Sequence, residues 1–189
     1  METRESMPDT PVNNQNLVPG SSHLSAVPFG VSIKTTIERG DAYSAPEIYD
    51  VEIAILEIVR GTDAWERIKV QSISNELPKA GFEYLLVRIK LAYSRRGRGL
   101  EDEAYKLIEG QFAAVAADGQ TEYMIPAVLQ QPQPQLVNTL FQSGESREGW
   151  IFLQVPEDEK KPLLVYKREH VEGVYGIWRY VWFQLYQRV

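Results

Sequence analysis

Residues able to do acid–base or nucleophilic chemistry are few in this sequence and poorly grouped. His23 lies in a polar N-terminal stretch, and His170 lies in the charged stretch 168–172. A hydrolytic triad needs a nucleophile, a base and an orienting acid that converge, and neither histidine has such a context. Glu101-Asp102-Glu103 could bind a cation, but neighbouring like charges are more typical of a solvated loop. We therefore predict no catalytic residues and a non-enzymatic protein.

Cofactor chemistry has little support in the composition. The chain has no cysteine and only two histidines, which excludes disulfides and thiolate catalysis and makes a zinc site improbable. No glycine-rich phosphate loop of the Walker or dinucleotide type is present. The formal net charge of −6 opposes general binding to phosphate backbones or anionic lipid. We expect no metal, no cofactor and no nucleic-acid partner.

A basic cluster, Arg95, Arg96 and Arg98, is a weak candidate for anion binding. Gly97 and Gly99 would let the backbone adapt to a phosphate, but three acidic residues follow at 101–103. The cluster is either a hairpin tip whose charges pair with one another or a contact for an anion such as RNA.

The predicted final strand, 177–186, carries aromatic residues on one face. These candidate binding residues are Trp178, Tyr180, Trp182 and Tyr186. The opposite face is apolar too, although a simple sandwich strand buries only one face. The aromatic face is either covered within the chain, by the Pro126–Gln135 crossing or the 94–104 loop, or is open to a partner. Flat Trp and Tyr rings with polar tips suit protein interfaces and sugar faces.

The elements that must position these residues are mainly strands. Leu85, Val87 and Ile89 alternate with polar residues in the predicted strand 84–93, as a half-buried antiparallel strand requires. The apolar phase shifts after Ile55, which indicates either a β-bulge or burial on both faces. Asp118-Gly119 predicts a hairpin turn between 112–115 and 123–125.

A short helix is predicted after Asp63, which would act as its N-cap, with Trp65 packed against the sheet. We expect an all-β antiparallel β-sandwich with one short connecting helix. It occupies residues 26–189, and residues 1–25 form a flexible tether because they are too polar to bury much surface. The predicted buried core contains Trp65, Leu85, Val87, Ile89, Trp150, Phe152, Phe183 and Leu185.

Five short segments occur in a recognisable order: 26–30, 60–65, 81–87, 144–150 and 162–166. They include an Arg-Gly-x-x-Ala-Trp step at Arg60, a Gly-x-Glu-Tyr-Leu-Leu-Val strand at Gly81 and a Gly-Trp-x-Phe strand at Gly149. Together they resemble a bacterial family of extracytoplasmic immunoglobulin-like domains of unknown function. Some members carry a telomeric-repeat-binding-factor label, and the family is similar in fold to a mycobacterial secreted immunogenic antigen.

The resemblance implies a secreted or membrane-anchored immunoglobulin-like sandwich and supplies no catalytic residues. The leader and lipid-attachment cysteine usual in such proteins are missing here, so a membrane link would need an N-terminal anchor absent from this chain. A cytoplasmic location is the other possibility.

Two functions follow as hypotheses. The first is an extracytoplasmic, non-enzymatic module that binds another protein or forms a homodimer. The alternative is a ligand-binding or carbohydrate-active domain that uses the Trp178/Tyr180/Trp182 face, with acids such as Glu169 and Glu172 nearby. A sugar-processing site would need two carboxyl groups flanking a cleft.

Overall fold

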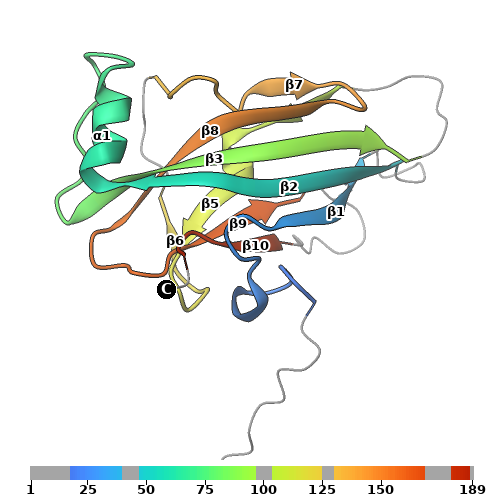
Figure 1. Ribbon diagram of the computed structural model, residues 1–189, viewed down its shortest axis with the longest axis horizontal. Helices are drawn as coiled ribbons and strands as arrows, with labels where there is room; N and C mark the ends of the chain where they lie inside the picture. Colours follow the sequence, from blue (N-terminus) through green and yellow to red (C-terminus); the bar gives the residue numbers. More distant parts are fainter. Residues whose placement is uncertain (1–17, 40–46, 97–103, 125–129, 169–179, 188–189) are drawn as a thin grey trace, which may run out of the picture.

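Two antiparallel sheets of four strands dominate the structure (Figure 1). The computed structural model describes residues 18–39, 47–96, 104–124, 130–168 and 180–187. The first sheet has the order β1-β2-β3-β8, with bounds Ser32–Arg39, Glu47–Arg60, Phe82–Arg95 and Ser146–Pro156. The second has the order β10-β9-β5-β6, with bounds Tyr180–Gln184, Leu163–Lys167, Phe112–Val115 and Glu122–Tyr123.

The remaining elements are short. A two-stranded ladder joins β4 (Tyr105–Leu107) to β7 (Thr139–Phe141). The α-helix α1 spans Gly61–Lys69, and the 3-10 turns η1 and η2 span His23–Ser25 and Glu109–Gln111. Among the described residues, no helix has both the length and the apolar composition needed to cross a membrane.

The main core lies between the two four-stranded sheets. Val51, Ile53 and Ile55 of β2 share it with Leu164 and Phe183 of the other sheet. At one end the core becomes aromatic and polar: the Tyr93 ring stacks between Tyr49 and Tyr105, at centroid distances of 5.0 and 5.1 Å. The buried Tyr105 hydroxyl bonds to the Tyr166 hydroxyl at 3.0 Å, so these polar tips are satisfied inside the core. The predicted all-β, antiparallel, sandwich-like character is confirmed.

A β-bulge in β2 explains the shift in its apolar phase. The pairing with β3 slips by one residue between Ile55 and Glu57. Before the slip the odd-numbered side chains face the main core, and after it Val59 faces the opposite side of the sheet. Leu56, at the slip itself, is left 38% exposed. Of the two interpretations that the sequence left open, the bulge accounts for the pattern.

A second apolar layer separates the first sheet from α1. Ala64 and Ile68 are completely buried against Tyr84, Leu86 and Phe152, which project from the face of the sheet opposite the main core. The first half of β3 and most of β8 are therefore buried on both faces. Trp150 and Phe152 point into this same layer, as predicted.

Two sequence predictions about α1 are wrong. The helix begins at Gly61, with Arg60 as the N-cap residue, so Asp63 does not cap it. Asp63 lies instead in the first turn, where a carboxylate complements the helix dipole. Trp65 is only half-buried: its ring lies 6.1 Å from that of Tyr84 at the edge of the layer. The other seven predicted core residues are buried.

Residues 134–136 run along the free edge of β8, and Leu136 and Val137 are buried in the main core. The Trp150 N–H donates to the Pro134 carbonyl at 2.8 Å, and the Leu136 N–H donates to the Trp150 carbonyl at 3.1 Å. A side chain at Gly149 would come within 2.7 Å of the Leu136 backbone, so this close approach requires glycine. The Pro/Gln run is thus fixed to β8 where it is described.

We expect Ile68, not Trp65, to anchor α1. Ile68→Ala should lower the free energy of unfolding by about 3 kcal/mol because it empties a fully buried site. Trp65→Ala should cost about 1–2 kcal/mol because its ring is partly in water already. Urea denaturation of both variants checks this. A larger loss of unfolding free energy for Trp65→Ala than for Ile68→Ala would contradict the role given to Ile68.

Candidate functional site

The aromatic face of β10 is only partly free. Trp178 lies outside the described residues. Tyr180 is 37% exposed, and its ring meets Trp182 edge to face at 6.1 Å and 85°. Trp182 and Tyr186 are half-buried and pack against Ala113, Val115, Leu163 and Val165, a cluster on the side of the second sheet away from the main core. The exposed aromatic surface among the described residues is therefore centred on Tyr180.

Residues 20–27 lie along the outer edge of β10 (Figure 1). The Trp182 N–H donates to the Gly20 carbonyl at 3.0 Å, and the Val27 N–H donates to the Trp182 carbonyl at 2.8 Å. The Gln184 N–H donates back to the Val27 carbonyl at 2.8 Å, which completes a short parallel bridge. Part of the segment that the sequence assigns to a flexible tether is thus paired to a strand.

Side chains of this N-terminal segment also cover the sheet. The His23 ring approaches Trp182 at 6.1 Å, and a side chain at Gly119 would collide with it. Ala26 joins the cluster under Trp182. Residues 130–138 of the Pro/Gln crossing lie beside β8 and do not provide this cover, and residues 97–103 and 125–129 lie outside the described residues. The sequence offered one signal of it, the apolar pair Ala26-Val27.

Two arginines of the basic cluster, Arg95 and Arg96, form ion pairs with carboxylates. The Arg95 side chain, 11% exposed, pairs with Glu47, and Arg96 pairs with Asp50 at 2.7 Å. Both carboxylates come from β2, whereas the acidic residues 101–103 lie outside the described residues. Arg98 lies outside the described residues. The pairing with β2 makes Arg95 and Arg96 less available to an external anion.

A charged hollow of about 600 Å³ lies over the ends of β1, β2 and β3. Its basic side chains include Lys34, Arg96 and Arg168, and its acidic ones include Asp50 and Glu52. Lys34 lies 3.8 Å from Glu52, and Arg168 donates to the Thr35 hydroxyl at 2.7 Å. Charges of both signs paired in this way leave little net field to attract an ion.

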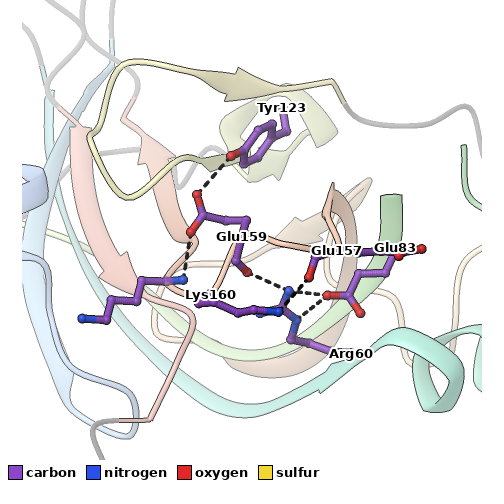
Figure 2. Close-up of polar contacts among 7 residues, drawn as sticks. Arg60, Glu83, Tyr123, Glu157, Glu159 and Lys160 are labelled. Carbon is purple, nitrogen blue, oxygen red and sulfur yellow. Dashed lines mark hydrogen bonds and ion pairs between the residues drawn. The ribbon is translucent and has the colours of Figure 1, made fainter. Parts of the chain in front are cut away.

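A polar network ties the two sheets together at the end where α1 begins (Figure 2). Arg60 pairs with Glu83 and donates to the Glu159 carbonyl at 2.9 Å. The Glu159 carboxylate accepts from the Tyr123 hydroxyl at 3.2 Å and from the Lys161 N–H at 2.9 Å. Glu159 thus links the turn after β8 to the hairpin β5–β6, and Arg60 links that turn to the first sheet.

Two of the segments that carry the family resemblance meet in this network. Arg60 and Gly61 come from one of them and Glu83 from the other. Gly61 has φ +61°, and a side chain there would lie 2.8 Å from the Glu83 carboxylate. These residue types are therefore explained by how α1 starts and by how the sheets are joined. Sequence reasoning missed the pair because Arg60 and Glu83 become neighbours only through the pairing of β2 with β3.

The pKa of Tyr123 is raised in this network. Burial, the nearby Glu159 charge and the hydrogen bond to Glu159 raise its pKa from 10.0 to about 12. Burial also raises the pKa of Tyr84 and of Tyr49, so these phenols hold their protons more tightly than a free tyrosine does. Phenols of this kind serve as hydrogen-bond donors at neutral pH.

Metal-ligating side chains do not gather in the described part of the chain. No group of three or more His, Asp or Glu residues there has the geometry to hold an ion. His170, Glu169 and Glu172 lie outside the described residues.

The chain matches no family model, no curated protein and no solved structure. Its class is defined by its own architecture: a mostly β protein of antiparallel sheets.

Tyr123 should make the protein sensitive to alkali. The folded state holds the Tyr123 proton more tightly than the unfolded chain, so its contribution to stability is complete below pH 10.0 and is lost as the pH rises toward about 12. Tyr123→Phe should flatten the fall in stability over this range relative to wild type. Denaturation at a series of pH values checks this; identical slopes would show that Tyr123 titrates normally.

The Arg60–Glu83 pair should stabilise more than a surface pair does. Its side chains are 27% and 19% exposed, against 41% and 39% for Arg88–Glu148. Glu83→Ala should cost about 2 kcal/mol because Arg60 loses its partner in a partly buried site. Glu148→Ala should cost less than about 1 kcal/mol. Equal losses in the free energy of unfolding, measured by urea denaturation, would show that the Arg60–Glu83 pair stabilises no more than a surface pair does.

Proposed function

We propose that this protein is a non-enzymatic, immunoglobulin-like β-sandwich module that works outside the cytoplasm and forms a homodimer through the exposed end of β10. The observation that carries the proposal is Tyr180, a residue of the edge strand β10 that is 37% exposed and whose ring packs edge to face against Trp182. The immunoglobulin-like topology and the extracytoplasmic location are supported by the resemblance of the five segments.

The aromatic pair at Tyr180 suits an interface. Tyrosine and tryptophan are enriched at the centres of protein contacts because rigid rings bury much area at little entropic cost. The Tyr180 ring is held by the edge-to-face contact with Trp182, at 6.1 Å between centroids. It is therefore partly ordered before a partner arrives, which lowers the cost of binding.

The edge of β10 supplies a second element, main-chain pairing. Residues 20–27 pair with Trp182 and Gln184, and in the described residues this pairing ends before Tyr180. Backbone groups alternate along a strand, so those of Tyr180 face the same edge as those of Trp182. An edge of this kind can accept a further strand.

A second copy is the partner to which we commit. A two-fold contact at the edge of β10 brings identical surfaces together, so Tyr180 would meet its counterpart near the symmetry axis. The net charge of −6 on each copy opposes association at long range. Because salt screens this repulsion, the dimer should strengthen as ionic strength rises.

Light scattering over a range of protein concentrations tests the dimer. Wild type should dimerise in the micromolar range, and Tyr180→Glu should weaken the dimer at least about tenfold because it places two like charges at the contact. Leu140→Glu is the matched control: Leu140 is an exposed apolar residue of β7, 53% exposed, and it receives the same charge. A wild type that stays monomeric at about 1 mM, or equal effects of both substitutions, would contradict the proposal.

A further inference from the structure

A hollow lined by amide side chains lies beside the segment that crosses β8. Its volume is about 530 Å³, and its lining consists of Gln71, Glu109, Asn138 and the four glutamines of residues 130–135. It has no lining residue in common with the aromatic end of β10, so it is independent of the proposed dimer.

The carboxylate of Glu109 orients two of these amides. Its Oε1 atom accepts from Gln131 Nε2 at 2.9 Å and from Asn138 Nδ2 at 3.1 Å. A carboxylate only accepts, so both amides must turn their NH₂ groups toward it and leave their oxygens for other donors. The buried Gln131 Oε1 atom has no hydrogen-bond partner in the described structure.

Two further amides are oriented by main-chain carbonyls. Gln135 Nε2 donates to the Val137 carbonyl at 2.7 Å, and Gln71 Nε2 donates to the Arg67 carbonyl at 3.3 Å. Carbonyls accept only, so the side-chain oxygens of Gln135 and Gln71 remain available as acceptors. Gln133 has the opposite orientation: its Oε1 accepts from the Gln135 N–H at 3.3 Å, which leaves its NH₂ as a donor.

Hydrogen bonds hold the backbone of the segment that lines the hollow at both of its ends. Asn75 bonds both ways with Gln130, donating to its carbonyl at 3.1 Å and accepting from its N–H at 3.3 Å. At the other end of the crossing, Gln135 forms a parallel bridge with Trp150. A ligand would meet acceptors that are already placed, so little ordering entropy would be lost on binding.

We propose that this hollow binds a neutral saccharide. Sugar hydroxyls donate to oxygen acceptors, which Gln71, Gln135 and Asn138 supply, and they can accept from the Gln133 amide. The lining contains one carboxylate and no basic side chain, which suits an uncharged ligand better than an anion. The volume is that of a site for a small organic molecule and far exceeds the shell of oxygens at about 2.4 Å that a calcium ion requires.

Nitrogen–proton correlation spectra of the wild-type chain test the site directly, because the amide side chains are their own reporters. The probes are maltotriose, cellotriose and chitotriose, each titrated to about 10 mM. The side-chain NH₂ signals of Gln130, Gln131, Gln133 and Asn138 should shift with at least one probe. Those of Gln120, Gln142 and Gln187, which are exposed and do not line the hollow, should stay in place.

A matched pair of variants separates the hollow from general surface effects. Gln71→Leu/Gln133→Leu should weaken the binding of the responding probe about tenfold or more, since one acceptor and one donor are lost. Gln120→Leu/Gln142→Leu makes the same chemical change outside the hollow and should have no effect. The titration of the wild-type chain tests the proposal even if one of the variants does not fold.

Three results would overturn the proposal. The first is the absence of shifts in the lining amides with all three probes. The second is a response of these amides to calcium chloride and not to the sugars. The third is equal binding by both double variants. The dimer proposed above is measured separately, by light scattering, so failure of one proposal does not decide the other.

Discussion

Burial of β3 and β8 on both faces is the constraint on which the rest of this structure depends. One face of these strands meets the second sheet, and the other meets α1 through Tyr84, Leu86 and Phe152. Strands with two apolar faces need cover on both sides, and α1, which follows β2 directly, supplies it on the side away from the second sheet. The bulge in β2 serves the same arrangement, because it turns Val59 toward the helix just before the helix begins.

The second sheet meets a similar constraint in a different way. Its outer face is apolar at Ala113, Val115, Leu163 and Val165, and no α-helix of the described residues covers it. The segment 20–27 does so in part, with Ala26 against the cluster and backbone bonds along β10. Among the described residues this cover ends before Tyr180, and the proposed dimer contact begins there.

Most of the charged residues described above hold the fold together. Arg60, Glu83 and Glu159 join the two sheets at one end, and Arg95 and Arg96 pair with β2 near the other. Charged side chains that pair within the fold are less available to bind a ligand. We therefore place the proposed binding roles on surfaces outside these ion pairs. Two of those surfaces are an aromatic strand edge at Tyr180 and a group of amides around Glu109. They suit a protein partner and a hydroxylated ligand respectively.

The sequence by itself determined the local structure well, because local structure depends on spacing. The alternation from Leu85 to Tyr93, the Asp118-Gly119 turn and the phase shift after Ile55 each depend on neighbouring residues, and each has the expected counterpart. Only the tertiary structure decided what those elements face. Trp65 is half-buried because the centre of its layer is filled by Ala64 and Ile68, and Arg95 pairs with Glu47 because β2 runs beside β3. The partner of Glu83, the cover of Trp182 and the amides around Glu109 come from segments far apart in the chain. Side chains so distant are brought together by strand pairing and layer packing, which no spacing within a single segment encodes.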